Sequence, residues 1–232
     1  MQSLEQFLRD IKNCTVLGNF ISIQDYTPID ISIHNVQFNK LQLKNADDFE
    51  RYIELYLEEK NAKVAYGGYN ETRNLYKRSG IFNDPSIEER NIHLGLDLWI
   101  KAGTPVLAAL DGTVHSFNYN TGLGDYGPTI ILEHTLENHI FYTLYGHLSL
   151  ESLKKLSVGD FYAQGQLLAT LGDSSVNGDY APHLHFQIIK DMQGMHGDYP
   201  GVCSKKNVEF YLNNCPDPNV LLQIKNLEKS ND

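Results

Sequence analysis

The sequence predicts a mainly β protein: an antiparallel β-sandwich or barrel-like domain with an N-terminal α+β extension. Short apolar runs recur from residue 93 to about residue 189, and turn residues separate them. Some runs alternate apolar and polar residues and others are continuously apolar, as half-buried and buried strands do. The chain also contains 18 Gly and 14 Tyr, a composition that favours a turn-rich β protein.

Residues 1–65 predict the mixed extension. Apolar residues at helical spacing indicate a helix over residues 3–14, and a second helix is expected at about residues 46–60. Alternating apolar residues over residues 20–43 indicate two or three short strands, broken near Pro28. We expect this extension to carry no chemistry of its own.

Two further segments flank the predicted β domain, which spans residues 93–190. Residues 66–92 are polar and rich in turn residues, so we expect a long connection that caps the domain. Residues 191–232 are expected to form a C-terminal extension packed on the core.

Within the β domain, the sequence predicts a hairpin and several other strands. Residues 105–110 and 113–117 flank Asp111-Gly112, a dipeptide that suits a type I′ turn. The remaining strands are expected over residues 129–134, 140–145, 161–163, 166–171 and 183–189.

Charge and composition exclude several classes of partner. The formal net charge of -10 disfavours nucleic acid and anionic membranes. There is no run of 18 apolar residues, so we expect no membrane span. The oligomeric state is left open.

The first ten residues lack both a basic region and an apolar core, so they do not form a signal peptide. We therefore expect the chain as written to be cytoplasmic, and exported only if a leader has been removed. Cys14, Cys203 and Cys215 are expected to be free thiols, with a disulfide between Cys203 and Cys215 as the alternative in an exported protein.

The richest chemical signal is the segment from Ala181 to Phe186, which places His183 and His185 two residues apart. Residues at this spacing share one face of a strand. The pair therefore suits two metal ligands, or one ligand beside a catalytic residue.

A second imidazole and a carboxylate come from His93 and Asp97. On a straight strand these residues would lie about 13 Å apart, which is too far for one ion. We expect a bend at Gly95, which tolerates it and places no side chain in the way. Two His and one Asp commonly hold a catalytic zinc and leave a fourth position open.

A further imidazole, His147, closes an apolar strand at the start of a loop, where active-site side chains often lie.

Together these motifs resemble the lysostaphin/LytM-type zinc metallopeptidase family. The resemblance covers about residues 93–189 and rests on His93-x-Gly-x-Asp97, Tyr145-x-His147-Leu148 and Pro182-His183-x-His185-Phe186. Segments 125–134 and 200–203 are similar to one branch, the module fused to class III aminotransferases in some bacteria.

The resemblance implies a zinc endopeptidase that acts on a peptide or muropeptide substrate. It assigns zinc ligation to His93, Asp97 and His185, and places His147 and His183 beside the attacking water and the scissile carbonyl. Which of these two is the general base stays open. Residues 174–181 depart from the family loop, with Ala181 in place of Gly, so we expect a reshaped substrate groove.

Two other functions are compatible with parts of the sequence. A non-catalytic regulatory module could keep the peptidase fold and its metal, but all five functional positions are filled here. A biotinyl or lipoyl carrier is disfavoured because no Lys lies at or beside the predicted Asp111-Gly112 tip.

Overall fold

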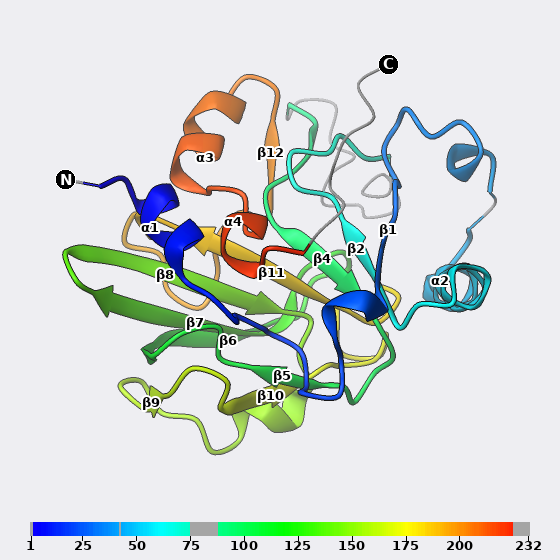
Figure 1. Ribbon diagram of the computed structural model, residues 1–232. Coiled ribbons are helices and arrows are strands. Elements are labelled where there is room, and N and C mark those ends of the chain that lie inside the picture. Colours follow the sequence, from blue (N-terminus) through cyan, green and yellow to red (C-terminus); the bar gives the residue numbers. More distant parts are fainter. Residues whose placement is uncertain (1, 42, 75–87, 225–232) are drawn as a thin grey trace.

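A computed structural model describes residues 2–41, 43–74 and 88–224 (Figure 1). Its largest element is an eight-stranded sheet in the order β1 (Tyr26–Pro28), β2 (Val64–Gly67), β4 (Leu96–Trp99), β11 (His183–Ile189), β8 (His139–Gly146), β7 (Gly127–Leu136), β6 (Gly112–Asn120) and β9 (Phe161–Tyr162). Two small sheets pair β5 (Pro105–Leu107) with β10 (Leu167–Thr170), and β3 (Arg90–His93) with β12 (Val202–Ser204).

The prediction of a mainly β fold is confirmed, including the strands expected between residues 129 and 189. The sheet is mixed, because β1 and β2 run parallel while the other described pairs are antiparallel. Among the described strands the order begins at β1 and ends at β9, so the large sheet is open and is not a closed barrel.

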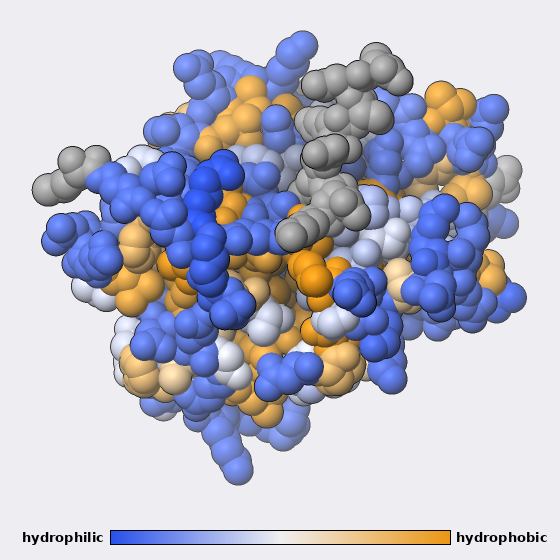
Figure 2. Space-filling view, viewed as in Figure 1, coloured by the Kyte–Doolittle hydropathy of each residue, from blue (hydrophilic) through white to orange (hydrophobic). Residues whose placement is uncertain are grey.

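The two predicted N-terminal helices form as α1 (Leu4–Asp10) and α2 (Ala46–Lys60). Asn45 caps α2, since its side-chain oxygen accepts the Asp48 N–H at 2.8 Å. The buried Phe49 and Ile53 of this helix pack in one cluster with Trp99 of β4. The outward face of α2, at the right edge of the molecule, is largely hydrophilic (Figure 2).

The prediction of two or three strands over residues 20–43 was wrong in part. Among the described residues of this stretch, only β1 forms a strand, and it lies between the 3₁₀ helices η1 (Ile23–Asp25) and η2 (Phe38–Lys40). Beyond β1, side chains satisfy the backbone in place of a sheet partner: Asp30 accepts the Ser32 N–H at 2.8 Å, and Asn35 accepts the Phe38 N–H at 3.0 Å. Ile29 and Ile31 are buried in the cluster that contains Phe49 and Ile53 of α2, whereas Ile33 is exposed.

The predicted hairpin at Asp111-Gly112 was also wrong. Strand β5 pairs with β10, whereas β6 pairs with β7 and β9, so the chain passes from one sheet to another at this point. A type I′ turn needs positive φ at both central residues, and neither Asp111 nor Gly112 has it. Gly112 serves close packing, because a Cβ there would lie 2.7 Å from Nδ1 of His134 on β7.

The C-terminal segment contributes β12, α3 (Val208–Asn214) and α4 (Asn219–Leu222). Several of its apolar side chains, among them Cys215 and Leu221, are buried in two of the clusters that contain strand residues of the β domain, whereas Phe210 is exposed. Cys14, Cys203 and Cys215 are free thiols. Of the predicted cap at residues 66–92, residues 75–87 lie outside the described part of the chain. No helix in the described ranges is long and apolar enough to span a bilayer.

Candidate metal centre

His93 and Asp97 lie on strands of different sheets, joined by Leu94 and Gly95. His93 ends β3, and Asp97 lies in β4 of the large sheet. The bend expected at Gly95 is confirmed. A Cβ on Gly95 would approach the His185 ring to 2.5 Å, so only glycine lets this ring pass over the backbone.

His185 completes the group from β11, where it is the cross-strand partner of Asp97. His93 Nε2 lies 2.9 Å from His185 Nδ1, His185 Nδ1 lies 3.1 Å from Asp97 Oδ1, and His93 Nε2 lies 3.3 Å from Asp97 Oδ1. Bonds of about 2.0–2.1 Å to one tetrahedral ion separate its ligand atoms by about 3.3 Å. The three donor atoms therefore need to move apart by only a few tenths of an ångström to hold a metal ion.

The hydrogen bonds of the other two ring nitrogens, His93 Nδ1 and His185 Nε2, determine which nitrogens of these rings carry a proton. His93 Nδ1 lies 2.9 Å from the Gly68 carbonyl oxygen, which only accepts, so this nitrogen carries the proton. Gln187 donates through Nε2 to the Pro200 carbonyl oxygen at 3.1 Å. Its Oε1, 2.9 Å from His185 Nε2, must therefore accept from that nitrogen.

With both rings neutral, His93 Nε2 and His185 Nδ1 thus present lone pairs to each other and to Asp97 Oδ1. Three hydrogen-bond acceptors therefore converge with no proton between them, and such an arrangement can hold a cation. The three residues are at most 3% exposed. Two imidazole nitrogens and one carboxylate oxygen form a donor set that suits zinc.

Burial and charge support the same protonation states. Burial lowers the pKa of His93 to about 3, and the positive charge of Arg73 adds to the shift. Burial raises the pKa of Asp97, but its neighbours, which include the positively charged Arg73, together outweigh burial and hold that pKa well below its usual value. The centre therefore holds a neutral His93 beside an ionised carboxylate, as metal binding requires.

His147 follows β8 immediately and adopts a positive φ of 61°, uncommon for a residue with a side chain. Its N–H donates to the Tyr126 carbonyl and its own carbonyl accepts from Gly172, which hold the backbone in this conformation. Its Nδ1 donates to the Asn177 carbonyl oxygen at 2.8 Å, so Nε2 is left as an acceptor. Burial lowers the pKa of His147 well below its usual value, and His183 and His185 add to the shift.

His183 is held in the same way, with Nδ1 donating to the Ala181 carbonyl oxygen at 2.7 Å. Its Nε2 lies 3.8 Å from Asp97 Oδ1, and its ring centroid lies 4.2 Å from that of His147. The Trp99 ring also stacks on His183, with the two ring centroids 5.7 Å apart. The structure thus brings all five sequence-predicted site residues together, with two neutral imidazoles beside the metal-ligand group.

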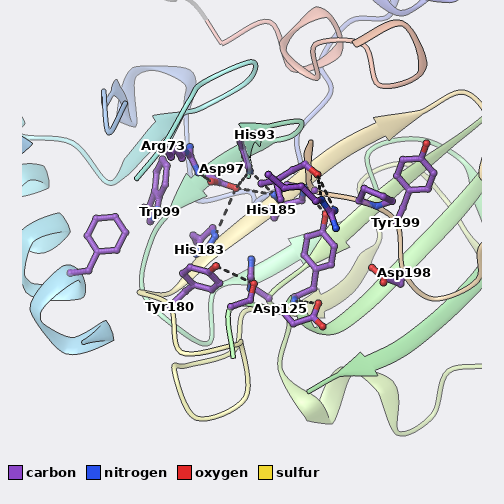
Figure 3. A pocket seen from close by; sticks show the side chains of 18 of the residues that line it. Arg73, His93, Asp97, Trp99, Asp125, Tyr180, His183, His185, Asp198 and Tyr199 are labelled. Atoms are coloured by element: carbon purple, nitrogen blue, oxygen red, sulfur yellow. Dashed lines mark hydrogen bonds and ion pairs between the residues drawn. The ribbon is translucent and has the colours of Figure 1, made fainter. Parts of the chain in front are cut away.

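These side chains line a cavity of about 260 Å³. Aromatic rings form much of its wall: Phe49, Trp99, Tyr126, Tyr180 and Tyr199. Asp125 and Asp198 lie across the pocket from Arg73 (Figure 3). Tyr180, in the loop predicted to reshape the groove, donates to the Gly124 carbonyl at 3.1 Å and packs edge-on against His147 and His183.

Sequence reasoning missed three residues of the site. Arg73 donates to Asp97 Oδ2 at 2.6 Å, Tyr126 places its hydroxyl 3.4 Å from His185 Nε2, and Asn177 orients His147. No spacing or motif marks Arg73 or Asn177. Tyr126 stands in segment 125–134, which carried part of the family resemblance, and that was its one signal.

Comparison with known proteins agrees with this geometry. Residues 91–197 match the model of peptidase family M23. The chain carries an M23 peptidase domain. All three metal-ligand residues and both neighbouring histidines fall inside the matched range.

Relatives of this M23 domain include an uncharacterized metalloprotease of Haemophilus influenzae, 34% identical over 95 residues, which are 41% of this chain and 18% of that protein. The peptidoglycan DD-endopeptidase ShyC of Vibrio cholerae is 34% identical over 105 residues, or 45% of this chain and 21% of that protein. Among solved structures, the catalytic domain of lysostaphin from Staphylococcus simulans is 25% identical with a TM-score of 0.40, covering 66% of this chain and 93% of that domain. The alignments thus span about a fifth of the curated relatives.

Proposed function

We propose that the protein is a zinc-dependent endopeptidase that hydrolyses a peptide or amide bond, with peptidoglycan peptides as its substrate class. One observation carries the proposal: three buried lone pairs from His93, Asp97 and His185 converge on one point, and two neutral imidazoles stand beside it. This combination supplies ligands for a cation and bases for a proton.

A zinc ion held by these three residues would supply Lewis acidity, which polarises a carbonyl group and makes water more acidic. The protein's own part is proton handling. Nε2 of His147 or of His183 accepts the proton of the attacking water, and the resulting imidazolium donates to the oxyanion or to the leaving amine. The water oxygen forms the new C–O bond, the peptide C–N bond breaks, and the products are a carboxylate and an amine.

The substrate class rests on the M23 domain and on the pocket. The relative ShyC is named a peptidoglycan DD-endopeptidase. The pocket here is walled by aromatic rings that can pack against the flat faces of peptide groups.

Digestion of purified muropeptides and of a peptide library, followed by mass spectrometry, tests the proposal. We expect cleavage products that disappear when a chelator is added and return with zinc. His185→Ala should lose both metal and cleavage, whereas His147→Ala should lose cleavage and keep the metal.

Stoichiometric zinc in the wild-type protein without cleavage of any muropeptide or library peptide would overturn the catalytic part. That result would favour the metal-binding regulatory module instead.

A further inference from the structure

We propose that Arg73, a residue outside the M23-matched range, is a positioning residue of the metal centre that holds Asp97 by one oxygen and leaves the other for the metal. Arg73 Nη1 donates to Asp97 Oδ2 at 2.6 Å, and both side chains are 2% exposed. Asp97 Oδ1 faces His93 and His185 instead. In Figure 3, Arg73 lies on one side of Asp97 and His185 on the other. The inference rests on the metal site of the proposed function.

Arg73 is itself held in place by its neighbours. Its Nε donates to Glu71 at 2.7 Å, and its guanidinium lies over the Trp99 ring at 5.6 Å from the centroid. Its backbone N–H donates to the Asn91 carbonyl at 2.9 Å, and the His93 N–H donates to the Glu71 carbonyl at 2.9 Å. The segment that carries Arg73 is therefore bonded directly to β3, the strand that carries a metal-ligand residue.

The chemical effect is on how Asp97 binds. A carboxylate can ligate through one or both oxygens, and a charge-assisted bond from a rigid guanidinium occupies one of them. Asp97 is then restricted to one oxygen, which keeps a coordination position open for water or substrate. The buried carboxylate also keeps a partner when no metal is bound.

The same segment orients a second metal-ligand residue. The carbonyl of Gly68 accepts from His93 Nδ1 at 2.9 Å and so fixes the tautomer of that ring. Gly68 has φ +100°, and a Cβ there would collide with the Arg73 guanidinium. Residues 68–73 thus supply hydrogen-bond partners for two of the three metal-ligand residues, His93 and Asp97. This segment precedes the matched range 91–197.

The test compares zinc affinity in four full-length proteins: wild type, Arg73→Met, Arg73→Lys and Arg90→Met. Affinity is measured by competition with a fluorescent chelator, the ligand field by the absorption spectrum of the cobalt-substituted protein, and folding by circular dichroism. Arg90 is a matched control because it lines the same pocket but donates to the Val202 carbonyl rather than to a metal-ligand residue.

We expect Arg73→Met to bind zinc 10- to 100-fold more weakly, the loss typical of removing an outer partner of a ligand, and to change the cobalt spectrum. The sign is diagnostic, because removing a positive charge by its electrostatic effect alone would strengthen cation binding. Arg73→Lys keeps the positive charge but lacks the planar guanidinium with its fixed donors. This variant should bind zinc at least about fivefold more weakly than wild type. Arg90→Met should stay within about twofold.

Equal or tighter zinc binding in Arg73→Met would overturn the inference, as would an equal loss in Arg90→Met. If Arg73→Met does not fold, Arg73→Lys decides alone, and wild-type affinity in that variant overturns the inference. A wild-type protein that binds no zinc would instead refute the proposed function, so the two failures are distinguishable.

Discussion

His147 and His183 face each other with ring centroids 4.2 Å apart, and each donates through Nδ1 to a backbone carbonyl, that of Asn177 and that of Ala181. Both rings therefore present an unprotonated Nε2. This shared orientation leaves either imidazole able to take a proton. The proposed function therefore assigns proton handling to this pair and metal ligation to His93, Asp97 and His185.

Replacing His147 by Ala should lower kcat about 10²- to 10⁴-fold, the usual contribution of a general acid or base. Zinc content should stay at the wild-type level, because His147 is outside the group of three metal-ligand atoms. Peptide hydrolysis rates and metal analysis of the purified variant check both parts. A variant that loses zinc together with activity would contradict the separation of roles.

Gly95→Ala should weaken zinc binding by at least about tenfold, because the new methyl group meets the His185 ring at 2.5 Å and must displace it. The control is Gly103→Ala, where a Cβ meets no atom within 4 Å although φ is +78°. That change should cost stability through backbone strain but leave zinc affinity unchanged. Chelator competition and thermal unfolding measure the two quantities, and equal zinc affinity in both variants would refute the prediction.

Gln187→Leu should weaken zinc binding about 10- to 100-fold, because His185 loses the acceptor that fixes its tautomer. Gln193→Leu is the matched control: Gln193 is exposed and accepts from the Tyr199 hydroxyl rather than from a candidate metal ligand. Zinc titration of both variants tests the contrast. Unchanged affinity in Gln187→Leu would show that the imidazole keeps its tautomer without this bond.

Stability should fall as the pH drops from about 6.5 to 4, in part because of His134. Burial lowers the pKa of His134 to about 4, from an ordinary value of 6.5. The unfolded chain therefore takes up a proton in this window while the folded protein does not, so the free energy of unfolding falls with pH. This one group accounts for about 3 kcal/mol over the window.

The matching variant is His134→Gln, which removes the titrating group. Urea unfolding at pH 7 and at pH 5 should show a smaller loss of stability in the variant than in the wild type. The same loss in both proteins would mean that His134 does not titrate in this range.

The candidate site residues could be picked out because their chemistry leaves a local pattern, whereas their division into metal ligands and neighbouring histidines came from the family resemblance. His183 and His185 share a strand face, and the glycine between His93 and Asp97 indicates the bend they need. Arg73 could not be predicted in this way. It contacts Asp97 of β4 from a segment that is hydrogen-bonded to β3, so the contact depends on how three parts of the chain come together. No periodicity encodes such a contact.

The errors in the predicted fold also have a physical cause. Alternating isoleucines after Pro28 satisfy the strand pattern, but Asp30 and Asn35 supply local hydrogen bonds that compete with a sheet. At Asp111-Gly112 the dipeptide favours a hairpin, whereas packing against His134 sends the chain to another sheet. At the first place local side-chain hydrogen bonds outweighed the strand pattern, and at the second tertiary packing outweighed a turn preference.

The pairing of β3 with β12, and of β4 with β2, has a consequence for how the protein can be trimmed. Both partner strands lie beyond residues 91–197, one after that range and one before it. Cutting the chain to the matched residues would strip a neighbour from each of the two strands that carry His93 and Asp97. The fragment would expose two unpaired strand edges beside the candidate metal ligands, where other chains could add on. We therefore expect that a soluble fragment must include β2 and β12 as well as residues 91–197.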